Sequence, residues 1–454
     1  MDKEMVKILA ENSQEAKLIS STRSICPVCG RQLPALRIRR GKEIFLEKTC
    51  PEHGDFSTVI WRGAQCFFDN WYEGAEALAE GENLCCPRDC GICSQHRQGT
   101  CCVLYEITRR CNLACPFCFA EGGAGEDIPF AKIEADLRTI IKPGETFLQL
   151  SGGEPTVRDD LPRIVALARE LGAKYIQLNS NGLRLGQDES LVAALADAGL
   201  SFVFLQFDGV TDDVYRKLRG RELLDIKTAA IENCGRHNIG VTLVPTLVPG
   251  VNTRQIGDII RFGVAHAPVV RGVHFQPVSF FGRYPAPPKN EDRYTLGDLL
   301  AALPLQTDGM ISLANIAPSH CDHPLCGFHS SYIAMEDGSM IPLTTRKSGG
   351  CCCGTVTAEQ NREYIGSRWL RKKKMPAAEE AAIAAGPNGA GVEEEDDFDR
   401  FLRLSRTRSF TVTAMAFQDA YNLDIERLRH CSLHVYEDGK FYPFCSRYLT
   451  LADR

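Results

Sequence analysis

Six short apolar runs alternate with amphipathic patterns between residues 103 and 280, and this alternation constrains the fold more than any other feature. We expect strands near 103–108, 146–151, 175–180, 202–208, 241–248 and 272–278. We expect helices near 129–141, 157–171, 188–199, 211–237 and 252–267. Repeated βα units form a parallel sheet with right-handed crossovers, which can curl into a partial barrel. Functional side chains then collect at the C-terminal ends of the strands.

The size and charge of the chain exclude several classes of protein. At about 100–200 residues per domain, 454 residues are enough for two to four domains. Lys and Arg total 52 against 58 Asp and Glu, so a nucleic-acid binder is not expected. An uninterrupted apolar run of about 18–20 residues is absent, so no transmembrane segment is expected. The charged N-terminal stretch lacks a signal peptide's apolar block, and we expect a cytoplasmic protein.

Cysteine usage points to metal or redox chemistry. The chain has 21 cysteines, many of them closely spaced. In a reduced cytosol such cysteines are more often metal ligands or redox groups than disulfides. Cys234 stands alone on an expected helix and is interpreted as a buried structural thiol.

The strongest motif is ITRRCNLACPFCFAEGG, in which Cys111, Cys115 and Cys118 follow the first expected strand. Three thiolates at this spacing can hold three irons of a [4Fe–4S] cube. A fourth cysteine does not follow nearby, so one iron would stay open for a substrate or cofactor. Spacing alone also allows a structural metal knuckle, but the position at a strand end, beside Phe117, argues against it.

One expected βα unit later comes SGGEPT, and with this order of motifs residues 103–280 resemble a radical S-adenosylmethionine (SAM) enzyme. The resemblance implies that the methionyl amino group of SAM is received by the backbone of Gly152, Gly153, Glu154 and Pro155. It also implies ribose or carboxylate contacts from Ser180, Asn181 and Asp208. Turn-forming Asn-Gly and Asp-Gly sequences are the alternative reading of these three positions. Arg219 and Lys217 either pair with the SAM carboxylate or are solvated helix charges.

A second triplet of the same spacing lies directly upstream, at Cys86, Cys90 and Cys93. We expect it to hold an auxiliary [4Fe–4S] cluster with Cys102 as the fourth ligand. His96 and Cys101 are alternative fourth ligands. The extra ligands at hand favour a fully ligated cluster over a second SAM site.

The N-terminal motif CPVC…CPEHG supplies Cys26, Cys29, Cys50 and His53. Two such knuckles about twenty residues apart are typical of a tetrahedral site for one metal ion. The intervening segment is expected to form a hairpin turning at Gly41, as in rubredoxins and zinc ribbons. The ion is zinc or iron, and a structural role is favoured over electron relay.

The C-terminal region carries further cysteines. We expect a second auxiliary [4Fe–4S] cluster held by Cys321, Cys326, Cys431 and Cys445. Three adjacent cysteines at 351–353 cannot easily ligate three irons of one [4Fe–4S] cluster. They supply either a single ligand or a reactive thiol.

The flanking motifs narrow the resemblance to one branch of the superfamily. CPRDCGIC, DAYNLDIERL-x2-C and PFC resemble the archaeal dihydropterin C-methyltransferases and the tetraether lipid synthases, with their bacterial relatives. The resemblance implies a transferase that cleaves SAM to a 5′-deoxyadenosyl radical and forms a carbon–carbon bond at an unactivated carbon. C-methylation of a small molecule such as a pterin is the preferred reaction, and coupling of lipid alkyl chains is the alternative. An external electron donor such as ferredoxin or flavodoxin is implied, and no catalytic side chain is assigned.

A multi-cluster electron-transfer protein is the alternative from another class, although such a carrier needs no SGGEPT motif. We expect an α/β fold, a partial (β/α)6 radical SAM barrel with an N-terminal rubredoxin-like or zinc-ribbon-like domain and a C-terminal iron–sulfur extension. The expected divisions are a lead-in helix (1–20), the metal domain (21–70), an auxiliary-cluster segment (71–102), the barrel (103–285), and a C-terminal auxiliary-cluster domain (286–454) with a disordered insert at about 371–400.

Overall fold

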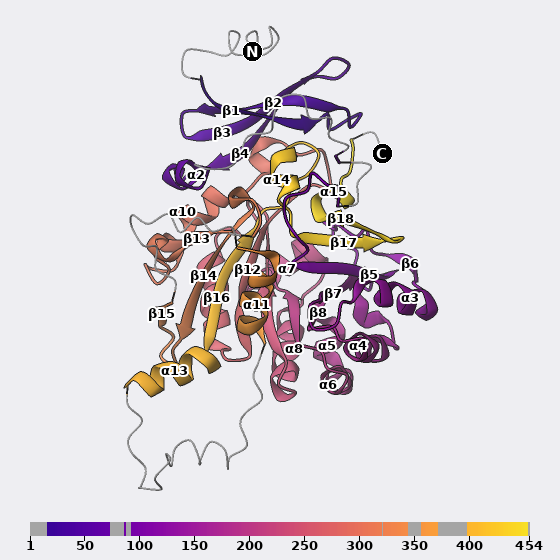
Figure 1. Cartoon of the computed structure of the whole chain (residues 1–454). Coiled ribbons are helices and arrows are strands. Elements are labelled where there is room, and N and C mark those ends of the chain that lie inside the picture. Colours follow the sequence, from indigo (N-terminus) through magenta and orange to yellow (C-terminus); the bar gives the residue numbers. More distant parts are fainter. Residues whose placement is uncertain are drawn as a thin grey trace.

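The computed structural model describes residues 16–72, 86–87, 92–319, 321–343, 356–370 and 397–452. A small sheet lies at one end of the molecule and packs on a larger α/β body (Figure 1). Residues 1–15 of the expected lead-in helix and residues 371–396 of the expected insert lie outside the described residues. Residues 397–400 are helical and open α13 (Asp397–Thr407).

The small sheet is antiparallel and contains the N-terminal cysteine motif. Its strands, in spatial and sequence order, are β1 (Ala16–Ile25), β2 (Gln32–Arg40), β3 (Glu43–Cys50) and β4 (Gly54–Arg62). Arg40 pairs with Glu43 across the turn at Gly41, so the expected hairpin is confirmed. Residues 16–20 belong to β1 and not to a lead-in helix, because β1 pairs antiparallel with β2 at the edge of the small sheet.

The six expected strands form the centre of the large sheet, and each lies within a few residues of its predicted place. They are β5 (Cys102–Arg110), β7 (Phe147–Gly152), β8 (Tyr175–Ser180), β9 (Phe202–Gln206), β10 (Gly240–Val244) and β12 (Val270–Pro277). Neighbours in the order β5-β7-β8-β9-β10-β12 pair in parallel. Strands of this kind are buried on both faces, which explains their nearly continuous apolar sequences.

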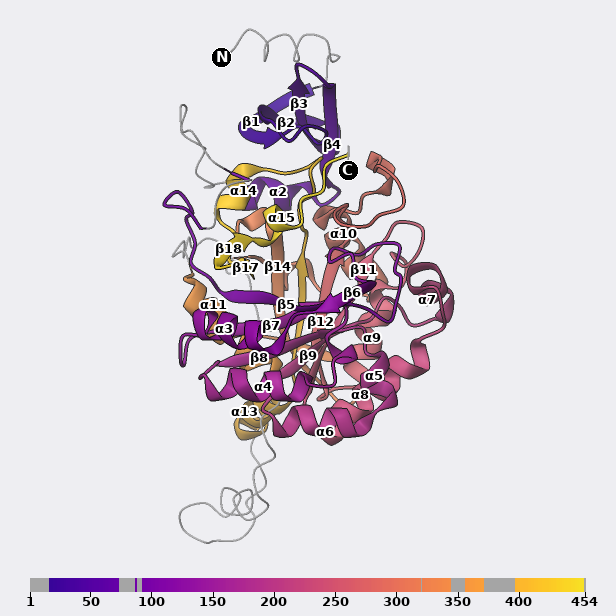
Figure 2. The ribbon, with the colours of Figure 1, turned by 90° about the vertical axis from the view of Figure 1, so that its right-hand side faces the viewer.

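Helices cover the outer side of these strands, and Figure 2 shows α4, α6 and α8 gathered there. The helices of this layer are α3 (Phe130–Ile140), α4 (Leu161–Glu170), α5 (Leu183–Gln187), α6 (Glu189–Asp197), α7 (Asp212–Arg219), α8 (Leu224–Arg236) and α9 (Ile256–Ala265). In α4 the buried residues are Leu161, Ile164, Val165 and Ala168, the spacing of one helix face.

The single helix expected at 211–237 is in fact two helices, α7 and α8. Gly220 ends α7 in a left-handed conformation. The Asp212 carboxylate then accepts hydrogen bonds from the backbone N–H groups of Leu223 (2.8 Å) and Leu224 (3.0 Å). These bonds satisfy N–H groups at the start of α8, so the break is stabilised locally.

The C-terminal region extends both edges of the same sheet. At the β12 edge lie β16 (Ser409–Met415), which is parallel to β12, and β14 (Gly327–Ala334), which is antiparallel to β16. At the β5 edge lie β17 (Leu433–Glu437) and β18 (Lys440–Pro443). The remaining strands are β6 (Ala124–Asp127), β11 (Thr246–Leu247), β13 (Ala317–Pro318) and β15 (Met340–Pro342). The other α-helices among the described residues are α2 (Gln65–Tyr72), α10 (Leu296–Gln306), α11 (Ala358–Trp369), α14 (Ile425–Arg429) and α15 (Phe444–Arg447).

Buried polar contacts join the small sheet to the segment around α14. Arg37, on β2, donates hydrogen bonds to Asp424 (3.0 and 2.6 Å) and to Glu426. The Lys48 Nζ atom donates to the backbone carbonyls of Ala420 (3.1 Å) and Tyr421 (2.9 Å). Within the described ranges we find no helix with the length and apolar character needed to cross a membrane.

Candidate active site and metal centres

The three cysteines of the strongest motif lie in the loop that leaves β5. The Cys111 N–H donates to the Gly123 carbonyl (2.9 Å), which closes the loop on itself. Cys118 and Arg283 exchange backbone hydrogen bonds of 3.0 and 2.9 Å, and the Arg283 Nε atom donates to the Cys115 carbonyl (2.8 Å). The chain segment after β12 therefore holds the cysteine loop in place. Burial, with Glu154 and the other two thiols nearby, raises the pKa of Cys111 to about 11.

Glycines allow the cysteine loop and the SGGEPT loop to touch. A Cβ atom on Gly153 would lie 2.2 Å from the Arg110 carbonyl oxygen, and one on Gly122 would lie 2.8 Å from the Gly153 Cα atom. Gly152 has a φ of +133°, a conformation that favours glycine. These three positions therefore accept only glycine without a shift of the backbone.

Glu154 is the centre of a buried hydrogen-bond network between two strand ends. Its carboxylate accepts bonds from the Ser180 hydroxyl (2.8 Å), the Asn181 N–H (2.6 Å) and the Thr156 hydroxyl (2.5 Å). Pro155 opens the single turn Pro155–Val157 that follows. The Asn181 amide reaches across to the Asn112 side chain (2.7 Å), inside the cysteine loop. Glu154, Ser180 and Asn181 thus fix the β7 and β8 ends against each other.

Asp208 is buried after β9 and is paired with Arg219 of α7. The guanidinium donates to both carboxylate oxygens, from Nε at 2.7 Å and from Nη2 at 2.8 Å. The Thr246 N–H adds a bond of 3.2 Å to the same carboxylate. Burial lowers the pKa of Arg219, but Asp208 and the Cys115 sulfur outweigh it, and the net pKa is raised. Lys217, on the same helix, is exposed.

These elements border a cavity of about 310 Å³ at the C-terminal ends of the strands. Its walls include all three loop cysteines, the backbone of Gly152 and Gly153, and Arg219. Glu154, Ser180 and Asn181 also line it, whereas Pro155 and Asp208 are outside its lining. The structure therefore brings most of the residues expected to bind SAM around one space.

Other parts of the cavity wall carry polar groups outside the cysteine and SGGEPT motifs. They include Gln149, Asn179, Gln276, His274 and Asn361. Gln149 and Asn361 donate to the sulfurs of Cys102 (3.2 Å) and Cys101 (3.3 Å), which also line the cavity. Burial lowers the pKa of His274 to about 4, so this imidazole is neutral at physiological pH. They come from four different elements, since Gln149 lies in β7, Asn179 in β8, His274 and Gln276 in β12, and Asn361 on α11.

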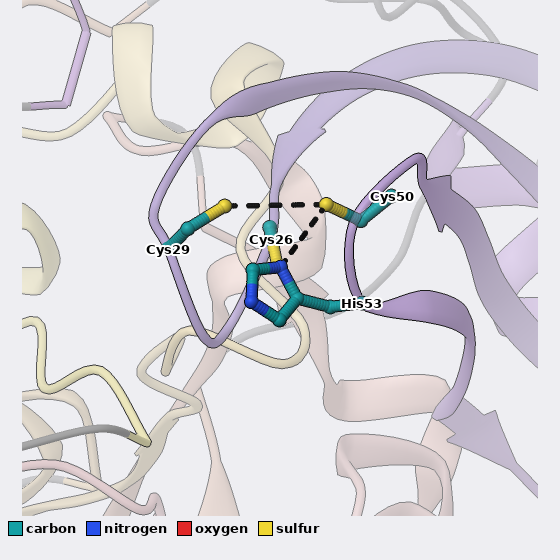
Figure 3. Close-up of side chains that lie close together, drawn as sticks. All are labelled: Cys26, Cys29, Cys50 and His53. Atoms are coloured by element: carbon teal, nitrogen blue, oxygen red, sulfur yellow. Dashed lines mark hydrogen bonds between the residues drawn. The ribbon is translucent and has the colours of Figure 1, made fainter.

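The N-terminal motif forms a compact cluster of four ligand atoms, drawn in Figure 3. The Sγ atoms of Cys29 and Cys50 are 3.9 Å apart. The His53 Nδ1 atom lies 3.7 Å from the Cys26 Sγ atom and 3.4 Å from the Cys50 Sγ atom. A tetrahedral zinc ion with Zn–S bonds of about 2.3 Å needs ligand atoms separated by roughly this distance. All four expected residues are thus in position to hold one metal ion.

The C-terminal cysteines divide into two groups. Cys326, Cys431 and Cys445 line one small cavity together with Asp322. Cys321 instead packs with Cys101 and Ala358, and the Cys101 thiol and burial raise its pKa. Cys321 therefore lies outside the lining of the small cavity that Asp322 and the other three cysteines share, which cysteine spacing could not reveal.

The upstream triplet is described only in part. Cys86 and Cys93 pack in the same apolar cluster as Cys102. Cys90 lies outside the described residues, as do the three cysteines at 351–353. His96 lies close to Cys431, because its Nε2 atom is 2.7 Å from that residue's carbonyl oxygen.

Comparison with known proteins adds to this geometry. Residues 105–263 match the model of the radical SAM superfamily, and residues 18–62 match the HMPTM N-terminal zinc ribbon domain. The chain is 33% identical to 7,8-dihydro-6-hydroxymethylpterin dimethyltransferase of Methanocaldococcus jannaschii, over 95% of this chain and 93% of that protein. This chain belongs to the radical SAM superfamily, in the family of that dimethyltransferase.

Other proteins match shorter regions of the chain. Fe-coproporphyrin III synthase of Methanosarcina barkeri is 33% identical over 35% of this chain and 38% of its own length. The solved structure of SuiB from Streptococcus suis is 19% identical, covers 46% of each chain and has a TM-score of 0.37.

Membership in the superfamily confirms the expected class of protein. The chain is a radical SAM enzyme, with a barrel that carries an N-terminal zinc ribbon. Enzymes of this superfamily use a [4Fe–4S] cluster and SAM, and the open cavity beside three cysteines fits that cofactor pair. The alternative of a non-catalytic electron carrier is therefore not supported.

Proposed function

We propose that this enzyme C-methylates a reduced pterin related to 7,8-dihydro-6-hydroxymethylpterin. Two observations support the substrate class, and the first is the identity to the Methanocaldococcus enzyme over almost the whole of both chains. The second is the polar wall of the cavity. Pterin rings carry several hydrogen-bond donors and acceptors along one edge, which amide side chains can match.

Two side chains of the polar wall, Asn179 and His274, have hydrogen-bonding groups that a ligand could use. Asn179 accepts from Gln177 through its oxygen (2.5 Å), and its NH2 group has no partner among the described residues. His274 is bonded through Nδ1 to the Thr413 hydroxyl (2.8 Å), which leaves Nε2 for a ligand. Phe204 and Trp369 flank the same imidazole. These groups favour a flat heterocycle over the apolar tunnel that a lipid alkyl chain would need.

The residues of this chain have separate roles in the proposed reaction. Cys111, Cys115 and Cys118 would hold three irons of the [4Fe–4S] cluster. The backbone at Gly152 and Gly153 would receive the methionyl amino group of SAM, and Arg219 would pair with its carboxylate. Held by these residues, the cluster and SAM would supply the radical chemistry needed to remove a hydrogen atom from an unactivated carbon. The apolar part of the cavity wall, which includes Phe204, Phe281 and Trp369, would limit access of water to that step.

Four further residues position the groups that would contact SAM: Asp208, Glu154, Ser180 and Asn181. Asp208 orients Arg219 through two hydrogen bonds, so it is a positioning residue. Glu154, Ser180 and Asn181 fix the strand ends, and Pro155 ends the loop in its turn.

The remaining metal sites are also part of the proposal. We propose one zinc or iron ion at Cys26, Cys29, Cys50 and His53, with a structural role. We propose two auxiliary [4Fe–4S] clusters, one at Cys326, Cys431 and Cys445 and one at Cys86, Cys90 and Cys93 with Cys102. An external donor such as ferredoxin or flavodoxin would supply electrons. Cysteines without disulfides among the described residues suit a cytoplasmic enzyme.

The decisive experiment uses anaerobically reconstituted protein with SAM and dithionite. We expect 5′-deoxyadenosine, and with 7,8-dihydro-6-hydroxymethylpterin we expect methylated product by mass spectrometry. Deuterium in the SAM methyl group would show whether that methyl is transferred. Cys115→Ala should abolish SAM cleavage, whereas Cys234→Ala, on α8, should retain it. SAM cleavage without any change in the pterin would refute the proposed substrate class.

A further inference from the structure

Three cysteines from distant parts of the chain meet at one small cavity. Cys326 ends the short helix Pro324–Cys326, Cys431 follows α14, and Cys445 lies in the first turn of α15. Cys445 is buried, Cys326 and Cys431 are half-buried, and all three line this cavity. A thiol is a costly residue to bury as a thiolate unless a metal accepts it, so this group is suited to a metal centre.

The fourth side chain at this cavity with a metal-ligating group is Asp322, not a cysteine. Asp322 is 9% exposed, and its Oδ1 atom accepts a hydrogen bond from the Ser432 N–H (2.7 Å). The neighbouring Cys321 faces Cys101 instead, so it does not complete this set.

A buried cation balances the negative charge around the cavity. Arg427 donates from Nη2 to the Cys326 sulfur (3.5 Å) and to the Ala416 carbonyl (2.9 Å). Its Nε atom is buried, and in the described part of the chain it has no hydrogen-bond partner. A buried guanidinium of this kind compensates a metal centre that carries several anionic ligands.

We propose that Asp322 is the fourth protein ligand of the auxiliary cluster held by Cys326, Cys431 and Cys445. The inference rests on the auxiliary cluster of the proposed function and adds the identity of its last ligand. A carboxylate is a harder ligand than a thiolate, so the iron it binds exchanges more readily. Asp322 lines both the small cavity and the 310 Å³ cavity. The iron that it binds would therefore lie between the auxiliary cluster and the proposed substrate cavity.

The test uses the full chain with Cys111→Ala, Cys115→Ala and Cys118→Ala, which removes the signal of the SAM cluster. In this background Asp322 is kept or changed to Asn, Ala or Cys, and iron content, EPR spectra and midpoint potentials are measured. With Asn or Ala we expect loss of one iron on mild oxidation and the EPR signal of a [3Fe–4S] cluster. With Cys we expect a stable four-iron cluster whose EPR spectrum and potential differ from those of the parent.

Controls separate ligation from a structural effect. Asp322→Asn can keep the hydrogen bond from Ser432 and so guards against simple misfolding. Asp136→Asn removes another buried carboxylate, which is bonded to Tyr105 (2.6 Å), and should leave the spectra unchanged. Identical spectra and potentials in all Asp322 variants would overturn the inference, as would a parent without an auxiliary cluster at these cysteines. SAM cleavage by the unmodified chain decides the proposed function independently.

Discussion

Asp208 and Arg219 form a bidentate ion pair beside the sulfur of Cys115. The Asp208 carboxylate is fully buried, and Arg219 lines the cavity. Such a pair fixes a planar cation in one orientation, which suits recognition of a carboxylate. The Gln206 amide and the Thr246 N–H also bond Asp208, so the carboxylate has little freedom to move. Asp208, for which the sequence offered either a SAM contact or an Asp-Gly turn, therefore holds Arg219 in place.

Asp208→Asn should weaken SAM binding without removing the cluster. The amide keeps the shape of the carboxylate but loses the charge that orients Arg219. We expect about tenfold weaker SAM affinity, which corresponds to about 1.4 kcal/mol, by calorimetry on reconstituted protein at equal iron content. Asp213→Asn, on the exposed side of the same helix, is the matched control. Equal affinity of the two variants would show that Arg219 does not contact SAM.

Gly153→Ala should disrupt the contact between the SGGEPT loop and the cysteine loop. Its Cβ atom would lie 2.2 Å from the Arg110 carbonyl oxygen, so the backbone must shift. We expect a loss of about 1–3 kcal/mol in the free energy of unfolding, together with reduced iron content and SAM cleavage. Gly123→Ala is the control, because nothing lies within 4 Å of its added methyl group. Normal SAM cleavage by Gly153→Ala would contradict the proposed role of this backbone.

The sequence predicted those features that lie within a few residues of one another. Each barrel strand is a buried apolar run, and each metal-binding loop has its ligands at short spacing, so both were recognisable. The split between α7 and α8 was missed because it depends on Gly220 together with capping by Asp212. A continuous amphipathic pattern does not reveal such a break.

Sites assembled from distant segments were less predictable. The grouping of Cys326 with Cys431 and Cys445 was expected, but the separation of Cys321 from Asp322 depends on which way two adjacent side chains point. The motif around Asp424 marked a family branch, yet its acidic residues bond Arg37 in the small sheet. Only the folded chain brings those partners together.

Cys26→Ala should remove the N-terminal metal ion and unfold the small sheet. Structural zinc contributes about 10–16 kcal/mol of binding free energy in zinc-finger peptides, so loss of one ligand is a large perturbation. We expect lower metal content by mass spectrometry and a lower thermal midpoint, with SAM cleavage retained by chains that stay folded. Cys66→Ala, at an exposed thiol on α2, should change neither quantity. A stable Cys26→Ala chain that cannot cleave SAM would instead indicate an electron relay.

Arg37→Met should destabilise the junction between the small sheet and α14. It removes a fully buried cation from between Asp424 and Glu426, and an unpaired buried charge of this kind costs about 3–5 kcal/mol. The measurement is chemical denaturation of matched metal-loaded samples. Arg31→Met is the control, because its pair with Glu52 is half exposed and surface pairs contribute about 0–1 kcal/mol. A similar loss in both variants would mean that burial of the Arg37 pair is not what stabilises the junction.

The ion pair between Arg37 and Asp424 should make the free energy of unfolding depend on pH. Burial raises the pKa of Asp424, but the Arg37 charge and hydrogen bonds outweigh it, and the net pKa is below the ordinary 3.8. The contribution of the ionised carboxylate is therefore fully present above an unfolded-state pKa of about 3.9 and is lost as pH falls through the folded pKa. We expect the difference in unfolding free energy between wild type and Asp424→Asn to be constant from about pH 5 to 8 and to shrink below about pH 4. A difference that instead grew toward low pH would mean that Asp424 is protonated in the folded chain, and that Arg37 is held by Glu426 alone.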